Sequence, residues 1–191
     1  MNTTQWSATL AMPVLPERDH LRGPPSASVM LVEYGDYECP YCRAAHAVVN
    51  AIQTQLQSRL SFVFRHFPLT TVHPHAQAAA EAAEAAGSQH KFWQMHDTLF
   101  ATDAPLTSNL FIAAAAELGL DMSSFHSELT RHVHVPRIRE DFMTGVRSGV
   151  NGTPTFYINA VRYDGAWDFP ALTAALNRAM APPIGVSGQP Q

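Results

Sequence analysis

The stretch VMLVEYGDYECPYC, residues 29–42, decides the fold of this chain. Its first part, residues 29–34, is a short apolar run with one acid inside it, bounded by Ser28 and Gly35, which predicts a buried strand. From Pro40 onward, apolar residues recur at three- and four-residue spacing, which predicts a helix over about residues 40–57. Cys39 and Cys42 therefore lie at the start of a helix that follows a strand.

Cys39 and Cys42 are the only cysteines among the 191 residues. A single close pair cannot form a disulfide framework for a domain of this size, so catalysis or metal binding is the expected use. A thiol at a helix N-terminus faces free backbone N–H groups and the positive end of the helix dipole, which favour the thiolate. We therefore predict that Cys39 is the nucleophile. Cys42, one turn further along the same helical face, is the predicted resolving thiol.

The rest of the chain alternates between strand and helix patterns. Residues 60–67 (LSFVFRHF) predict a second strand, parallel to the first because a helix connects the two. Between residues 73 and 149 every periodic segment is helical, and two late strands joined by a very short turn predict an antiparallel pair. The further predicted elements are helices at 75–86, 89–101, 107–118 and from near Pro136, strands at 155–159 and 161–164, and a last helix capped by Asp168.

The sequence resembles the thioredoxin-fold thiol-disulfide oxidoreductases, specifically the DsbA-like branch that carries a helical insertion. Four segments carry the resemblance and cover most of the chain from residue 29 to residue 180: the opening stretch at 29–42, RHFPLTTVHPHAQAAAEAAEAA at 65–86, KFWQMHDTLF at 91–100 and GVNGTPTFYINAVRYDG at 149–165. The resemblance implies an α/β, thioredoxin-like fold with a mixed central sheet and an inserted all-helical block.

The chain is expected to contain five segments. An N-terminal arm with little regular structure is expected at 1–27, followed by the first half of the thioredoxin fold at 28–72. The helical insertion is expected at 73–149, the second half of the fold at 150–180, and a flexible tail at 181–191.

The resemblance also assigns residues around the two cysteines. It implies that Thr153-Pro154 forms a cis-proline loop packed beside the cysteine pair, and that this loop contacts substrate together with Pro40 and Tyr41. The residues alone predict only a tight turn at this point, because cis bonds occur at about 5–6% of X–Pro bonds.

Glu33 is the one acid in an otherwise apolar strand, so it needs a reason to be there. The resemblance implies that Glu33 lies beneath the cysteines and helps to move the proton of Cys42, with a pKa raised by burial. The alternative is a Glu33 that points to solvent from a strand edge. Asp36 and Glu38, which flank the site, are expected to be solvated loop charges.

The expected function is thiol-disulfide exchange between Cys39-Cys42 and protein or peptide thiols and disulfides, with an unidentified electron donor or acceptor and no bound cofactor. One alternative is a glutathione-linked enzyme, because Cys-Pro-Tyr-Cys is also the glutaredoxin motif. Another is a non-enzymatic metal-binding or protein-binding module. Zinc would need histidines beside the cysteines, but His66, His73 and His75 lack the compact spacing of zinc ligands. We therefore predict no metal site, and packing and loop hydrogen bonds for these histidines.

The composition and charge of the chain limit the classes of partner that it is expected to bind. The formal net charge is −4 and no basic run is present, which argues against a nucleic-acid partner. The apolar runs are far shorter than the 18 or so residues that span a bilayer, so no membrane association is expected. The first basic residue is Arg18 and the preceding apolar residues are scattered, unlike a signal peptide, so a cytoplasmic location is expected.

Overall fold

The computed structural model of the protein describes residues 9–181. The elements are, in order, β1 (His20–Arg22), β2 (Val29–Gly35), α1 (Pro40–Leu56) with a 3-10 turn at Gln57–Arg59, β3 (Leu60–His66), α2 (Ala76–Gly87), α3 (Phe92–Ala101), α4 (Ser108–Glu117), α5 (Met122–Thr130), α6 (Val135–Ser148), β4 (Thr155–Ile158), β5 (Val161–Tyr163) and α7 (Phe169–Met180).

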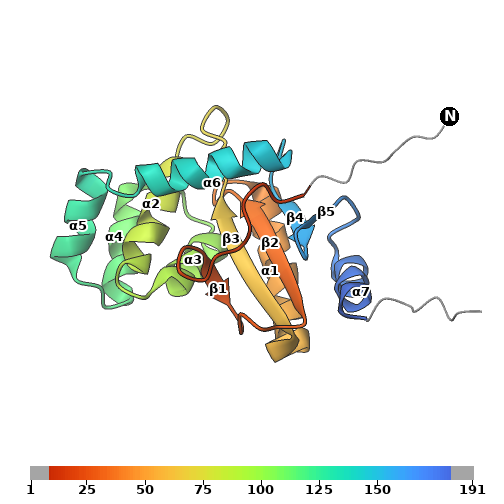
Figure 1. The fold of residues 1–191 in the computed structure, drawn as a ribbon. Helices are drawn as coiled ribbons and strands as arrows, with labels where there is room; N and C mark the ends of the chain where they lie inside the picture. The colour runs from red at the N-terminus through yellow and green to blue at the C-terminus, as the bar shows by residue number, and fades with distance from the viewer. Residues whose placement is uncertain (1–8, 182–191) are drawn as a thin grey trace, which may run out of the picture.

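The strands form one mixed sheet in the order β1-β3-β2-β4-β5 (Figure 1). β2 and β3 are parallel, and β4 and β5 pair antiparallel, as the sequence predicts. β2 lies in the middle, between β3 and β4, so that Glu33 pairs with Phe64 on one side and with Phe156 on the other. A strand in this position has no free edge, and its side chains are covered on both faces.

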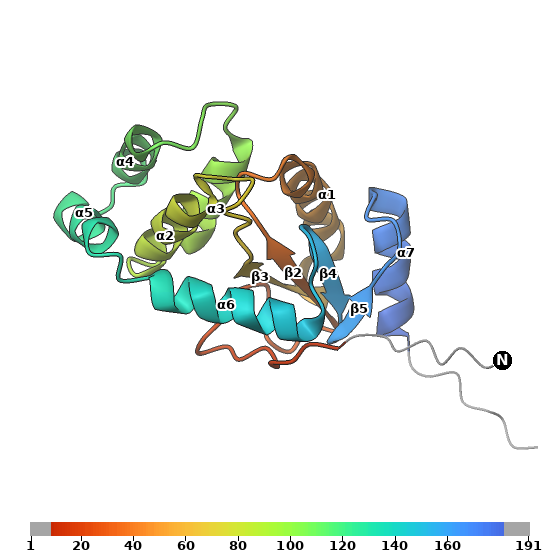
Figure 2. The same ribbon diagram turned by 90° about the horizontal axis from the view of Figure 1, so that it is seen from above.

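Each face of the sheet carries its own layer of helices. Because side chains alternate along a strand, Leu31 of β2 belongs to the hydrophobic core shared with α1, α3 and α7. Val32 and Tyr34 point the other way, into a smaller core with Phe67 and Tyr157. Figure 2 shows α6 on this second side and α1 across the sheet from it. α1 therefore brings its N-terminus, with the cysteine pair, to one end of the central strands.

The helices α2–α5 form a block beside the sheet, and α6 leads from the block back along the sheet (Figures 1 and 2). α2 lies inside this block and packs against α3, α4, α5 and α6. Its alanine side chains are short, which allows neighbouring helices to approach closely, and most of them are fully buried. Within the described residues, no helix has the length and apolar character needed to cross a membrane.

Two elements correct the sequence-based expectations, whereas the other predicted elements are present within a few residues of their expected ends. The arm at 1–27 contains β1, whose three residues pair antiparallel with β3, and a strand this short gives no readable alternation. The helix α5 was not predicted. Its signal is the cap at Asp121, whose side chain accepts a hydrogen bond from the Ser124 backbone N–H. Residues 1–8 of the arm and 182–191 of the tail lie outside the described residues.

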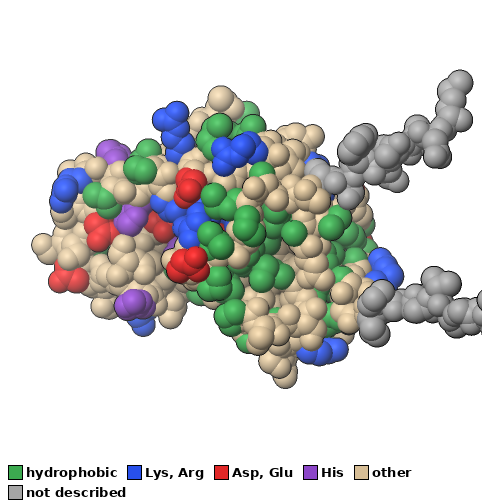
Figure 3. Space-filling model, in the orientation of Figure 1, with side chains coloured by type: hydrophobic (Ala, Val, Ile, Leu, Met, Phe, Trp, Pro, Cys, Tyr) green, Lys and Arg blue, Asp and Glu red, His purple; other side chains and the backbone are tan. Residues whose placement is uncertain are grey.

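On the face seen in Figure 3, basic side chains are scattered among acidic ones, and hydrophobic side chains gather over the sheet. This face offers no continuous basic surface that would track a phosphate backbone.

Candidate active site

The cysteine pair is positioned by the first turn of α1. Cys39 is the N-cap residue with extended backbone angles, and Pro40 occupies the first helical position, where its missing N–H costs no hydrogen bond. The Arg43 backbone N–H donates to the Cys39 carbonyl oxygen at 3.1 Å and closes the first turn. Both cysteines are free thiols, and both are buried. The helix start predicted from the sequence is therefore the observed one.

The environment of Cys39 favours its thiolate. The Cys42 thiol, the Thr153 side chain and the backbone N–H groups of Cys42 and Tyr41 act together against the cost of burial and lower the pKa of Cys39 to about 5. These backbone groups are free because the first N–H groups of a helix have no partner within the helix. At neutral pH the Cys39 sulfur is therefore ionised.

The environment of Cys42 has the opposite effect and favours the protonated thiol. Burial raises the pKa of Cys42 well above its usual value, and the hydrogen bond to Cys39 and the nearby Glu33 raise it further. Its sulfur accepts a hydrogen bond from the Asp36 backbone N–H at 3.4 Å. The two thiols are thus separated into an ionised one and a protonated one.

Glu33 is buried, with 2% of its surface exposed, which excludes the solvent-facing alternative. Its Oε1 atom has no hydrogen-bond partner among residues 9–181. Burial, and secondarily the charge of Cys39, raise the pKa of Glu33 to about 8. Because Glu33 also raises the pKa of Cys42, the three groups form one coupled set. Glu33 is thus a largely protonated acid at neutral pH, close enough to both thiols to sense their charge.

The Thr153–Pro154 turn lies against the cysteine pair. The Thr153–Pro154 peptide bond is cis. The Cys39 sulfur is 3.4 Å from the Thr153 carbonyl oxygen, although the two residues are 114 positions apart. Tyr41 is 65% exposed and Pro40 is also exposed, so both border the site on its solvent side. The structure therefore brings together all of the predicted site residues.

Asp36 and Glu38 are not solvated loop charges, and this expectation was wrong. Asp36 is buried and accepts hydrogen bonds from the Leu69 backbone N–H at 2.8 Å and from Glu38. Its Oδ2 also lies 2.8 Å from the ring of His73, and Glu38 pairs in the same way with His75. The two acids and the two histidines thus form a clamp that joins the loop between β3 and α2 to the loop that carries the cysteines. No local pattern predicts this clamp, because the partners in each pair are 37 positions apart.

The histidines near the cysteines in sequence do not form a zinc site with them. His73 and His75 belong to this clamp, and His66 pairs with the buried Glu84 at 2.8 Å. Among the described residues, the one group with the spacing of metal ligands is His46, His96 and Asp97, which contains no cysteine. A zinc-binding module built on Cys39 and Cys42 therefore finds no support in the geometry.

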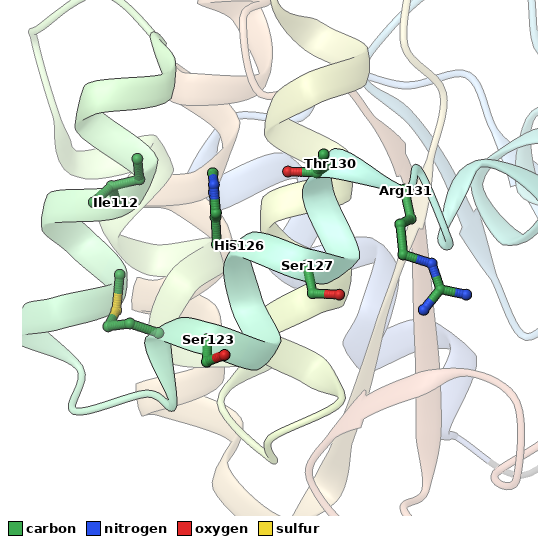
Figure 4. Close-up of a pocket in the computed structure, with 7 residues that line it drawn as sticks. Ile112, Ser123, His126, Ser127, Thr130 and Arg131 are labelled. Atoms are coloured by element: carbon green, nitrogen blue, oxygen red, sulfur yellow. The ribbon is translucent and has the colours of Figure 1, made fainter.

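An open hollow of about 810 Å³ lies on the helical block, between α4 and α5. Figure 4 shows Ile112 from α4 facing Ser123, His126 and Thr130 of α5. The residues that line it include no thiol and no buried carboxylate, so its surface has no part in the chemistry of the cysteine pair.

The sheet order and the helical block define a protein of the thioredoxin fold, and solved structures share this fold. BdbD from Bacillus subtilis superposes with a TM-score of 0.79 at 20% identity, covering 91% of this chain and 98% of that one. A thioredoxin-like oxidoreductase from Silicibacter pomeroyi DSS-3 gives 0.72 at 27% identity, covering 85% and 92%. The α-DsbA1 of Wolbachia pipientis gives 0.75 at 22% identity, covering 90% and 94%.

The family model described as Thioredoxin matches residues 16–178, so the chain belongs to this family. Among curated proteins, the chain is 46% identical over 172 residues to a protein named Na(+)/H(+) antiporter NhaA 1 from Salinispora arenicola, covering 90% of this chain and 26% of that one. A protein of the same name from Mycobacterium sp. strain KMS is 41% identical over 170 residues, covering 88% and 28%. The chain thus spans about a quarter of the length of these relatives.

Proposed function

We propose that the protein is a thiol-disulfide oxidoreductase that exchanges a Cys39–Cys42 disulfide with protein or peptide thiols. The observation that carries the proposal is the position of the pair at one helix N-terminus, with the Cys39 sulfur 3.4 Å from the Thr153 carbonyl oxygen; there the pKa of Cys39 is lowered to about 5 and that of Cys42 is raised. An inert buried pair would show burial effects of the same sign on both thiols. The proposal does not include the antiporter activity in the names of the relatives, because the chain spans only about a quarter of their length.

The exchange has two steps, each of which forms and breaks one S–S bond. In the first, a substrate thiolate attacks the Cys39 sulfur, a mixed disulfide forms, and Cys42 leaves. In the second, another substrate thiolate attacks the substrate sulfur of the mixed disulfide and releases Cys39 as a thiolate. The substrate dithiol is oxidised, and the enzyme disulfide takes up its two electrons. A separate electron acceptor must then restore the Cys39–Cys42 disulfide.

Glu33 supplies the proton for the first step. Cys42 is a poor leaving group because its pKa is high, and a proton delivered to its sulfur removes this obstacle. With a pKa of about 8, the Glu33 carboxyl group is mostly protonated at neutral pH, so it is ready to donate. In the reverse reaction the same group accepts the Cys42 proton before Cys42 attacks the mixed disulfide.

The low pKa of Cys39 also favours one direction of disulfide exchange, the oxidation of the substrate. An ionised Cys39 stabilises the reduced protein, and a stabilised reduced form makes the disulfide a stronger oxidant. We therefore infer that the protein donates disulfides, with a reduction potential above the value of about −270 mV that is typical of thioredoxin. Equilibration against a glutathione buffer measures this potential, and a value below that of thioredoxin would reverse the inferred direction.

The Thr153 backbone offers a place for the substrate peptide. Its carbonyl oxygen lies within 3.4 Å of the Cys39 sulfur, so a peptide joined to Cys39 passes directly over it. An extended peptide can pair its backbone with Thr153 as an added strand does, which recognises the main chain rather than one side chain. Exposed Tyr41 and Pro40 provide apolar surface beside this path.

Trapping variants test the proposal. In the reduced protein, we expect Cys39 to be alkylated faster than Cys42 at about pH 6, because only Cys39 is ionised there. Given a peptide that contains a disulfide, Cys42→Ser should accumulate a mixed disulfide, because its Cys39 thiolate attacks the peptide disulfide and the other peptide sulfur leaves as a thiolate, whereas Cys39→Ser should not. If neither variant traps a peptide, or if Cys42 is alkylated first, the proposed roles are wrong. Turnover with glutathione alone, and none with peptides, would favour the glutaredoxin-like alternative instead.

A further inference from the structure

His46, His96 and Asp97 form a cluster that the cysteine chemistry does not use. Each residue offers one donor atom, and the three atoms lie within 4.8 Å of one another. His46 comes from α1, and the other two come from α3, so the cluster joins the helix that carries the cysteines to the helical block. His46 is seven residues from Cys39, or about 10 Å along a helix at 1.5 Å per residue, so the cysteine sulfurs are separate from the cluster.

We propose that His46, His96 and Asp97 bind one divalent cation of the zinc type. Two imidazoles and one carboxylate are a ligand set that Zn²⁺ and Co²⁺ accept, with water completing the coordination. Ca²⁺ and Mg²⁺ are poor candidates, because they prefer oxygen ligands. The expectation of no metal site considered only the histidines near the cysteines, and no local pattern indicates this cluster, because His46 and the other two residues are about fifty positions apart.

His96 is held in place as a ligand by its surroundings. Its ring is buried, with 1% of the residue exposed, so water does not compete for its nitrogens. The Tyr37 hydroxyl lies 3.0 Å from its Nδ1, which leaves Nε2 to serve as the ligand atom. A metal-bound histidine commonly donates its other ring N–H to an oxygen, and the Tyr37 hydroxyl supplies that oxygen.

Asp97 is positioned as a ligand by the two residues that its carboxylate contacts, His46 and Arg22. Arg22 holds the Oδ2 atom at 2.6 Å and lies over the Trp93 ring at 4.5 Å, so the carboxylate is oriented. Its Oδ1 atom faces His46, as a ligand that uses one oxygen requires. The charge of Arg22 weakens cation binding, which favours a modest affinity.

The environment of His46 supports a cation at this point. Its Nε2 lies 2.9 Å from Asp97 Oδ1 and 3.1 Å from the side-chain amide nitrogen of Asn50. One ring nitrogen cannot donate to the carboxylate and accept from the amide with a single proton. Turning the Asn50 amide, so that its oxygen faces the ring, removes this conflict, and a cation bound here would then receive lone pairs from the His46 nitrogen and the Asp97 carboxylate. The 2.9 Å separation must widen to roughly 3.3 Å in a tetrahedral zinc site.

Metal titration of a thiol-free chain tests the proposal. The Cys39→Ser/Cys42→Ser double variant, without an affinity tag, removes the sulfur ligands and makes the result independent of the proposed redox function. We expect it to bind one equivalent of Co²⁺ with visible d–d bands and no thiolate charge-transfer band, and Zn²⁺ to displace the Co²⁺. A 100-fold excess of Zn²⁺ over its Kd should raise the thermal midpoint by roughly 5–10 °C.

Single substitutions in the same background locate the site. His46→Gln and Asp97→Asn are preferred to changes at buried His96, and each should lower the affinity at least tenfold while the circular dichroism spectrum is retained. His126→Gln, at an exposed histidine of α5, is the matched control and should leave the affinity unchanged. Absence of stoichiometric binding in the double variant, or binding that neither His46→Gln nor Asp97→Asn weakens, would overturn the proposal.

Discussion

Glu33 and Asp19 are both buried carboxyl groups, and they lie on opposite sides of the same sheet. Asp19 receives two hydrogen bonds from Arg65, at 3.0 and 2.9 Å, and one from the Leu15 backbone N–H. Burial alone would raise the pKa of Asp19, but these bonds lower it overall. Glu33 has an unpaired Oε1 and a pKa raised to about 8. A buried acid with full partners stays ionised and holds the structure, whereas one without partners keeps a proton that it can transfer.

The largest change in the free energy of unfolding should come from removing Arg65, the main partner of buried Asp19. Arg65→Met keeps an apolar body but leaves the Asp19 carboxylate buried without its main partner, which typically costs about 3–5 kcal/mol. Urea unfolding at pH 7 measures the loss. Asp19 keeps Arg18 at 2.8 Å in this variant, and the double variant Arg65→Met/Asp19→Asn, which removes the under-compensated charge, should recover part of the stability. A loss below about 1 kcal/mol in the single variant would mean that this pair behaves as a surface ion pair does.

Replacing Glu33 should have the opposite effect and increase the stability of the protein relative to the wild type as the pH rises. Because the folded-state pKa is near 8 and the unfolded value near 4.5, the folded protein keeps a proton between these pH values that the unfolded chain has lost. The free energy of unfolding therefore falls as pH rises through this window. Glu33→Gln removes that loss, so its stability relative to the wild type should increase by roughly 2–4 kcal/mol from pH 4 to pH 8.

The Glu33 measurement is best made on the oxidised proteins, in which no thiolate contributes to the pH dependence. There the charge of Cys39 is absent and burial alone, the larger cause, raises the pKa of Glu33, so the effect should fall toward the lower end of this range. Glu117→Gln, at an exposed glutamate of α4, is the control and should show no such trend. A pH-independent difference between Glu33→Gln and the wild type would show that Glu33 titrates normally in the folded protein.

The smallest effect is expected for an exposed acid whose partner is a backbone N–H. Asp168 caps α7 and accepts a hydrogen bond from Ala171 N–H at 2.9 Å. Asp168→Ala should destabilise the protein by about 1 kcal/mol, the usual value of an N-cap, and should leave the ionisation of Cys39 unchanged. Thermal unfolding and a thiolate titration by ultraviolet absorbance check the two parts. Asp168→Asn, which keeps the cap, should retain most of the stability.

The site could be predicted from the sequence where its signals are local. Cys39, Pro40 and Cys42 occupy one helical turn, and the apolar neighbours of Glu33 indicate its burial. The position of Thr153 beside Cys39 is implied only by the family resemblance, since no local pattern encodes a contact between residues 114 positions apart. The Asp36–His73 clamp was missed for a related reason. Charged residues far apart in sequence look solvated, and only the tertiary fold shows which of them meet.

The same limit applies to elements of the fold. Residues 29–34 and 60–67 carry enough alternation or apolar character for a strand to be recognised, whereas the three residues of β1 do not. The polar sequence of α5 concealed a helix that buries only Phe125 fully. Both elements depend on neighbours for their stability, and that information is absent from a short window of sequence.

The segment before β1 has a practical consequence for moving this module between proteins. The Leu10 N–H donates to the Ala160 carbonyl, and the Ala11 N–H donates to the Ser148 hydroxyl. Arg65 donates to the carbonyls of Met12 and Pro13. A shortened version of the protein that starts at β2 would lack these contacts and would also lack Asp19. A graft into another polypeptide should therefore start no later than Thr9, and any connector should join ahead of that residue.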